Sequence, residues 1–228
     1  MARTLFTNVS IFDGSGAKPY TGEVLVEGNR IKKLAKTGTK LPRDGATVVD
    51  GGGATLMPGL VEAHGHLSFC DTSTLEGLGD IPPEEHTLKT MKYAKVILDQ
   101  GFTSVFSAAS AKARIDVVIR NAINDGEIPG PRMRPASPEL TVTGGLGDVR
   151  RTHIYRETFA ICCDGPDEFR KTVRMLDLGP LDAIETQVKR WRARATRSPR
   201  GDAGAEQACR AEGTALRSLT WDVIAPAV

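Results

Sequence analysis

The sequence predicts a mixed α/β protein in three consecutive parts. Residues 1–56 contain short β-prone runs separated by turns, residues 57–176 alternate strands with amphipathic helices, and residues 177–228 are rich in arginine and alanine. Successive short strands favour a small antiparallel sheet, whereas alternating strands and helices favour βα units around a parallel sheet. We therefore expect a small β-segment, a parallel α/β domain and an atypical C-terminal tail.

Composition excludes several classes of protein. The chain has 228 residues, 40% hydrophobic and 25% charged, with a net charge of +2 that favours no particular partner. Only 5% of the residues are aromatic, which argues against a base-stacking surface, so no nucleic-acid partner is expected. Residues 1–8 lack the apolar core of a signal peptide, and no run has the length of a membrane span. We expect a cytoplasmic protein with no membrane partner.

The cysteines give no sign of a metal or disulfide framework. The chain contains four of them, none in a Cys-x-x-Cys pair, namely Cys70, Cys162, Cys163 and Cys209. This spacing is typical neither of a zinc finger nor of a small disulfide-rich domain. Buried or free thiols in a reducing compartment are the simpler interpretation.

Four β-prone runs make up the first part of the chain. They cover residues 5–12, 22–27, 30–35 and 46–50, and three of them end at turns that contain glycine. Gly28-Asn29 is typical of a two-residue hairpin turn between the second and third runs. We expect the four runs to form one antiparallel sheet.

Helical periodicity and short apolar runs alternate in the second part. The spacing predicts helices over 86–100, over 112–125 and from 165 onward, with strands at 102–107 and 133–137. The expected apolar positions are Leu88, Met91, Ala94, Ile97 and Leu98 in the first helix, Ile115, Val118, Ile119, Ala122 and Ile123 in the second, and Phe169, Val173 and Leu176 in the third. A TIM-type barrel fits this alternation, and its active sites lie at the carboxyl ends of the strands.

One stretch carries the strongest chemical signal, the segment 58–67 that begins Pro-Gly-Leu and ends His-Gly-His-Leu. Side chains two apart on a strand point to the same side, so His64 and His66 should project together near the strand end. Two neutral imidazoles on one side can bind a divalent cation such as zinc. A pair of histidines held only by hydrogen bonds is the alternative interpretation.

A glycine-rich loop follows the third predicted strand. Residues 141–148 read Thr-Val-Thr-Gly-Gly-Leu-Gly-Asp, which favours either a backbone that approaches a ligand or a flexible turn. His153 lies just beyond it and is a candidate substrate-binding residue, with a solvated loop histidine as the alternative. His86 opens a predicted helix, and we expect it on the surface.

The segment 58–67 resembles the first barrel strand of the amidohydrolase superfamily. That strand reads Pro-Gly-Leu/Ile-x-Asp/Glu-x-His-x-His and supplies two metal ligands, and the matching positions include Pro58, Gly59, Glu62, His64 and His66. The strand-and-turn order of residues 3–56 resembles the half of a β-sandwich that accompanies the catalytic barrel in this superfamily. The loop 141–148 resembles the Gly-Gly-x-Gly-Asp loop of a branch that includes imidazolonepropionase-like enzymes, ochratoxinase-like amidases and Xaa-Pro dipeptidases, although some relatives carry histidine where this chain has Leu146.

The resemblance implies a partial TIM-type (β/α) barrel and a hydrolase that acts on carbon–nitrogen bonds. It implies one or two divalent metal ions, zinc above all, in the full-length parent, and a metal-activated water that attacks an amide or peptide bond. The implied partner is a small-molecule amide or dipeptide, and a homo-oligomer is compatible with it. An aspartate and two histidines from later strands normally complete the site, but no histidine follows His153.

The resemblance ends near residue 176. A complete barrel takes about 250 residues, but only 172 remain from Met57 onward. Where the family places a strand of the type Val-Asp-x-Ile-Lys with a metal-bridging lysine, this chain has Glu185, and residues 189–200 hold six basic residues and no acid. We interpret residues 177–228 as the product of a frameshift near codon 184, which would leave a truncated, inactive chain.

A second function class stays open. Ile184, Val188, Trp191 and Ala195 have helical spacing opposite a basic face, so the tail could form a genuine amphipathic helix. The chain would then be a non-catalytic binding protein that uses its N-terminal sheet and basic tail. Indifference to a chelator together with salt-sensitive partner binding would distinguish it from a metal enzyme.

Overall fold

The computed structural model describes residues 2–151, 153, 155 and 157–177. The chain divides into two compact units between Gly59 and Leu60. The predicted tail helix and the expected departure at Glu185 lie outside the described residues. Within the described residues, no helix combines the length and apolar character needed to cross a membrane.

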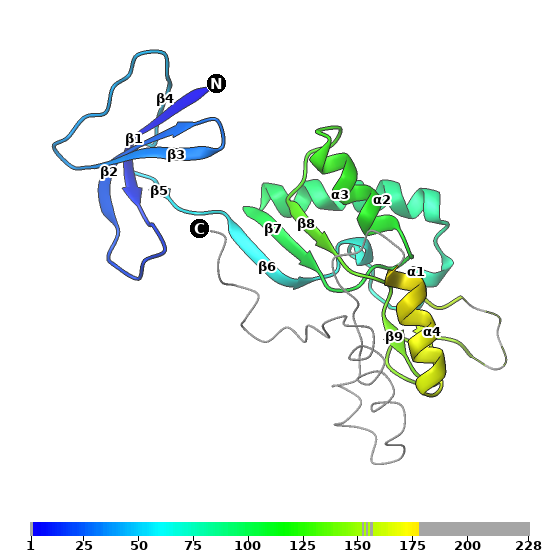
Figure 1. Ribbon diagram of the computed structural model, residues 1–228. Helices are drawn as coiled ribbons and strands as arrows, with labels where there is room; N and C mark the ends of the chain where they lie inside the picture. Colours follow the sequence, from blue (N-terminus) through cyan, green and yellow to red (C-terminus); the bar gives the residue numbers. More distant parts are fainter. Residues whose placement is uncertain (1, 152, 154, 156, 178–228) are drawn as a thin grey trace. The chain divides into compact units, whose positions relative to one another are not determined.

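The first unit is a five-stranded sheet (Figure 1). Its strands are β1 (Arg3–Ile11), β2 (Tyr20–Glu27), β3 (Arg30–Lys36), β4 (Thr47–Asp50) and β5 (Thr55–Leu56). The order is β3-β2-β1-β4, and β5 also pairs with β1. The predicted hairpin turn joins β2 to β3, where Gly28 has a φ of +60°.

The expectation of a wholly antiparallel sheet is wrong for β4 and β5. β1-β2 and β2-β3 are antiparallel, but β4 and β5 both run parallel to β1. The reason is that residues 37–46 cross from β3 to the other side of β1, and such a crossover brings a strand back in the same direction. The turn at 51–53 then lets β5 continue along β1 beyond a bulge, where Asn8 has a φ of +52°.

The first unit has a small hydrophobic core on each face of the sheet. One cluster contains Leu5, Leu25, Ala35 and Leu41, and the other contains Val9, Ile11 and Val24. Close packing of β2 against β3 requires glycine at position 22, because a Cβ there would lie 2.2 Å from the Ala35 carbonyl oxygen.

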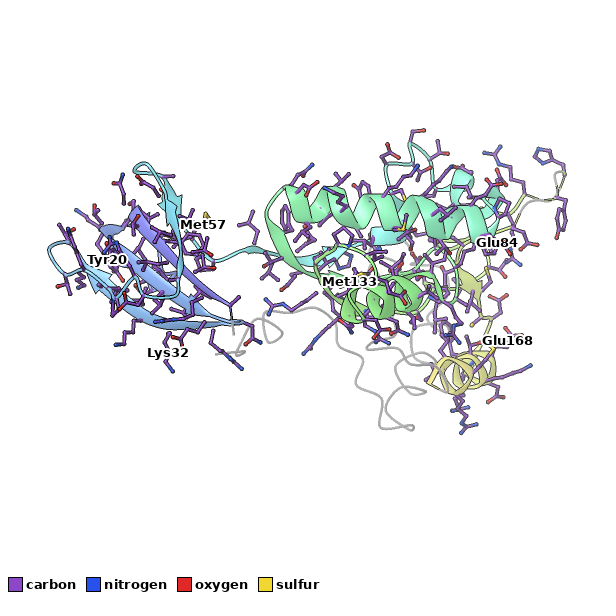
Figure 2. All side chains as sticks on the ribbon, turned by 90° about the horizontal axis from the view of Figure 1, so that it is seen from above. Tyr20, Lys32, Met57, Glu84, Met133 and Glu168 are labelled. Carbon is purple, nitrogen blue, oxygen red and sulfur yellow. The ribbon has the colours of Figure 1, made fainter. Side chains whose placement is uncertain are left out.

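The second unit contains three parallel strands, β6 (Leu60–Gly65), β7 (Phe102–Ser107) and β8 (Arg132–Pro135), in that order. Helices α2 (Pro83–Asp99) and α3 (Ile115–Asn124) cover one face of this sheet (Figure 1). The core between them contains Leu67, Ala94, Val105, Ile115, Ile119 and Met133. Met133 on β8 is labelled in Figure 2. The predicted βα pattern is thus confirmed, although the described residues form no closed barrel.

The predicted apolar faces of α2 and α3 pack in the core through Ala94, Ile115 and Ile119, but each face has one exception and the helices bury polar residues that were not predicted. Leu88 and Val118 are exposed, whereas His86, Thr90 and Asp116 are fully buried. Apolar periodicity locates a helix, but it does not identify polar side chains that will be buried with hydrogen-bond partners. In α2 and α3 such polar side chains are among the most buried.

The remaining elements lie around the carboxyl ends of the three strands. They are the 3₁₀ turn η1 (Leu67–Phe69), α1 (Glu76–Asp80), β9 (Leu140–Thr141), β10 (Ile161–Cys162) and α4 (Pro166–Asp177). The short parallel pair β9-β10 has no counterpart among the predicted strands. In α4, the predicted apolar residues Phe169, Val173 and Leu176 are buried, as expected. Figure 2 labels Glu168 in the first turn of this helix.

Candidate metal centre

His64 and His66 lie at the carboxyl end of β6, the first strand of the parallel sheet. His64 is on the strand, and His66 follows the strand as the N-cap residue just before η1. Their rings meet edge to face, with centroids 5.1 Å apart and planes at 87°. The prediction that both imidazoles come together at the strand end is confirmed. Whether they bind metal stays a prediction.

Neighbouring aromatic rings hold the His66 imidazole. His66 stacks on Phe69 with a centroid distance of 4.4 Å, and Phe69 in turn meets the edge of Phe159 at 5.2 Å. Phe159 is buried in a cluster with Leu78. The ring plane of His66 is therefore fixed by packing on one side.

The His66 ring also meets the backbone of the loop that follows β7. The Ala109 N–H donates to Nδ1 of His66 at 3.2 Å, and the Ala109 carbonyl oxygen lies 3.4 Å from the same nitrogen. The two contacts belong to different tautomers. With Nδ1 unprotonated, the ring accepts the Ala109 N–H, whereas with the proton on Nδ1 the ring donates to the carbonyl and Nε2 has the lone pair that a metal needs. The second tautomer would assign a bound metal to Nε2 of His66.

The carboxylate of Glu62, two residues before His64, turns back onto the strand. Its Oε1 accepts the His64 backbone N–H at 2.9 Å. The absence of a side chain at Gly65 leaves space for it, since a Cβ there would lie 2.9 Å from Cγ of Glu62. The Glu62 carboxylate is therefore a hydrogen-bond acceptor for the backbone of β6 in this structure.

The two imidazoles fit a divalent cation as part of a larger ligand set. Imidazole nitrogen is a good ligand for zinc and related metals, and catalytic zinc normally takes three protein ligands. In the part of the chain that the structure describes, no group of three or more histidine, cysteine, aspartate or glutamate side chains is arranged to hold a metal. His64 and His66 therefore provide two imidazoles, and the described residues add no third ligand of these types to them.

Two carboxylates accept hydrogen bonds from the glycine-rich loop. The Asp148 carboxylate accepts the Gly144 N–H at 2.9 Å and pairs with Arg150 at 2.7 Å. The bond from Arg150 holds the pKa of Asp148 well below its usual range. Asp164 accepts both the N–H and the hydroxyl of Thr143. The loop is a hydrogen-bonded turn in which Leu146 is 42% exposed, and both predicted alternatives for it stay predictions.

His153, the predicted substrate-binding residue, is exposed. The contacts of the described residues do not join it to His64 or His66 in a metal-holding group. Its role toward a substrate stays a prediction.

The surface position predicted for His86 is wrong. His86 is fully buried, and its Nε2 donates to the Ser68 carbonyl oxygen at 2.5 Å. Burial lowers the pKa of this imidazole, which favours the neutral ring. The first turn of α2, where we expected His86 on the surface, packs against η1. The sequence near the start of a helix does not indicate that a distant segment will pack over it.

Sequence reasoning did not identify Asp116 as a special residue. This acid in the first turn of α3 is fully buried, and burial raises its pKa to about 6, against smaller opposing effects from the hydroxyls of Ser107, Ser68 and Ser110. An acid in the first turn of a helix is usually exposed and interacts favourably with the positive end of the helix dipole. Its burial behind the histidines shows only in three dimensions.

Known proteins resemble this chain over part of their length. No model of a known protein family matches the sequence. The chain is 39% identical over 84 residues to 5′-deoxyadenosine deaminase of Methanothermobacter thermautotrophicus, covering 37% of this chain and 18% of that protein. It is 30% identical over 143 residues to dihydroorotase of Leifsonia xyli subsp. xyli, covering 59% of this chain and 29% of that protein. The chain therefore spans less than a third of each of these curated relatives.

Solved structures match over more of the chain. An amidohydrolase is 26% identical with a TM-score of 0.68, and a prolidase complexed with N-methylphosphonate-L-proline is 25% identical with a TM-score of 0.69. Each match covers 81% of this chain and 46% of the other protein. Ochratoxinase of A. niger, at 18% identity and a TM-score of 0.62, shares the fold. By these matches and its His-x-His strand, the chain resembles proteins of the amidohydrolase superfamily, a prolidase among them, and spans less than half of their length.

Proposed function

We propose that His64 and His66 are the first two metal ligands of a metal-dependent hydrolase, and that the full-length parent cleaves a carbon–nitrogen bond in a small amide or dipeptide. The observation that carries the proposal is the edge-to-face pair of imidazoles, 5.1 Å apart, at the carboxyl end of the first parallel strand. Active sites of (β/α) barrels lie at this end of the strands.

The residues around the pair suit this role. In the tautomer that donates from Nδ1 of His66 to the Ala109 carbonyl oxygen, Nε2 would take the metal, and Phe69 covers one side of the ring. When bound, a divalent cation at this position would supply an activated water and polarise the scissile carbonyl. The ordered loop 141–148 follows the third parallel strand, and its exposed Leu146 gives a substrate an apolar contact.

The chain itself should bind metal weakly and turn over slowly, if at all. Catalytic zinc sites normally use three protein ligands, whereas this sequence has no histidine after His153. The carboxyl-terminal part of the parent would supply the missing ligands and the general base. The same reasoning keeps zinc as the first metal to test, since imidazole ligands favour it.

Metal titration of the full chain tests the proposal. Zn²⁺ added to metal-free protein should bind, and both His64→Ala and His66→Ala should abolish the binding. His153→Ala is the matched control, because it removes an exposed histidine outside the pair and should leave metal binding unchanged. Equal Zn²⁺ binding by wild type and the double variant His64→Ala/His66→Ala would contradict the proposal.

The hydrolytic part needs a separate assay. Xaa-Pro dipeptides are the first substrates to try, after the prolidase among the structural matches, followed by N-acyl amino acids. We expect turnover only when the missing segment of a related amidohydrolase is fused after residue 176, and we expect a chelator to abolish it. Turnover that persists in the chelator would rule out a metal-dependent mechanism.

A further inference from the structure

A buried cluster of polar side chains lies directly behind the end of β6. It consists of Ser68, Ser107, Ser110 and Asp116, and each of these residues is at most 1% exposed. The Ser107 hydroxyl donates to Oδ2 of Asp116 in a short hydrogen bond. The hydroxyls of Ser68 and Ser110 are near enough to lower the pKa of this carboxyl, although the Ser110 hydroxyl itself donates to the Lys112 carbonyl oxygen. We call this group the serine–aspartate cluster.

Ser107 of the cluster and the next residue, Ala108, contact the segment that carries His66 on the two sides of that residue. After His66, the Leu67 N–H donates to the Ser107 hydroxyl oxygen at 3.3 Å. Before it, the Gly65 carbonyl oxygen accepts the Ala108 N–H at 2.7 Å. The turn at His66 is therefore held between two bonds from the end of β7.

The cluster also holds the loop that touches the imidazole. The Ser68 hydroxyl oxygen accepts the Ala111 N–H at 2.8 Å, and the Ser110 N–H donates to the Ser137 carbonyl oxygen at 3.0 Å. Residues 108–111 are thereby fixed to η1 on one side and to the end of β8 on the other. Within this loop lies Ala109, whose peptide groups contact Nδ1 of His66.

We propose that Asp116 is a positioning residue for His66, acting through Ser107 and Ser68 to set the turn that carries the imidazole and the loop that contacts Nδ1. The proposal rests on the proposed function, because that function is what makes His66 a metal ligand. The placement of the ring by the cluster is a property of the metal-free chain as well.

The chemistry of the cluster explains why a carboxylate occupies position 116. A carboxylate accepts hydrogen bonds at either oxygen, so Asp116 takes the Ser107 proton without offering a competing donor. An asparagine keeps the shape but replaces one acceptor with an N–H₂ donor. With that donor toward Ser107, the serine hydroxyl has to turn, which weakens its bond to the Leu67 N–H. The effect at the imidazole is indirect, as for the partners that orient metal ligands in other proteins.

The test is nitrogen NMR of the histidine rings in the metal-free full chain, which contains four histidines. Asp116→Asn and Ser107→Ala should each shift the Nδ1 resonance of His66 and weaken its contact with the Ala109 amide proton. Thr172→Val is the matched control. It removes a buried hydroxyl that bonds to Cys163 beside α4, away from β6. This control should leave the His66 resonances unchanged.

A Zn²⁺ titration of the same three variants completes the experiment. We expect Asp116→Asn and Ser107→Ala to lower the affinity about 10-fold, the lower end of the usual range for residues that orient a metal ligand. Thr172→Val should bind as wild type does. A purely structural role would instead lower metal affinity in step with stability in all three variants.

The outcomes separate the two proposals. If wild type binds no Zn²⁺, the proposed function fails, but the ring resonances still decide whether Asp116 positions His66. Folded Asp116→Asn and Ser107→Ala proteins with wild-type His66 resonances would overturn the positioning role. Equal shifts in Thr172→Val would also overturn it. If Asp116→Asn does not fold, Ser107→Ala carries the test, because it keeps the carboxylate and removes one link.

Discussion

Replacing Asp116 by asparagine should remove a loss of stability that the wild-type chain undergoes as the pH rises. Burial raises the pKa of this carboxyl from its ordinary value of 3.8 to about 6. The folded chain therefore holds the proton more tightly than the unfolded chain does. The resulting stabilisation is complete below pH 3.8 and is lost as the pH rises through about 6.

The size of the effect follows from the two pKa values. One pKa unit corresponds to about 1.4 kcal/mol, so the difference between 3.8 and about 6 amounts to about 3 kcal/mol. Asparagine does not titrate, so the variant lacks this contribution. Between these two pH values, wild type should lose about 3 kcal/mol of stability relative to Asp116→Asn.

Hydrogen exchange of the amides in β7 and α3 gives the free energy of local opening at each pH, once the intrinsic pH dependence of exchange is removed. The control is Asp125→Asn, which removes an exposed acid at the other end of the same helix. It should follow the wild-type profile. If the stability of wild type and of Asp116→Asn changed with pH in the same way, the reasoning would be refuted. Asp116 would then titrate alike in the folded and the unfolded chain.

Three further results are expected. Phe169→Ala should cost about 3–5 kcal/mol in urea unfolding of the second unit, because it empties a fully buried site, whereas Met175→Ala on the exposed face of the same helix should change stability by less than about 0.5 kcal/mol. Gly22→Ala should lower the melting temperature of the first unit, because its Cβ would lie 2.2 Å from a backbone carbonyl oxygen of β3, and the neighbouring exposed Thr21→Ala should not. Sequencing the coding DNA across codons 170–228 should reveal another reading frame with a strand-borne lysine and later histidines, and closed alternative frames would refute the frameshift.

Local signals in the sequence were sufficient for the strands and helices that carry the site. The His-x-His spacing on a strand predicted the meeting of the two imidazoles, and the turn at Gly28-Asn29 predicted the hairpin between β2 and β3. Helical periodicity located α2 and α3 within a few residues. Each of these features depends on residues close together in the chain, which is why pattern and spacing could predict them.

The features that sequence reasoning missed depend on contacts between distant residues. The direction of β4 is set by how the chain crosses β1, and no residue in β4 encodes it. Burial of His86 and Asp116 arises because η1 and the end of β7 cover the first turns of two different helices. The β9-β10 pair has only two residues in each strand, too few for any periodicity to show.

The turn at Ser68 lies between a buried base and a buried acid, since its carbonyl oxygen meets His86 and its hydroxyl faces Asp116. Burial lowers the pKa of His86, so the imidazole stabilises the fold less as the pH falls below its ordinary value of 6.5. Asp116 has the opposite slope over the same range. The two groups therefore change the stability of the turn at Ser68 in opposite directions as the pH falls. Removing either one would leave only the pH dependence of the other at this turn.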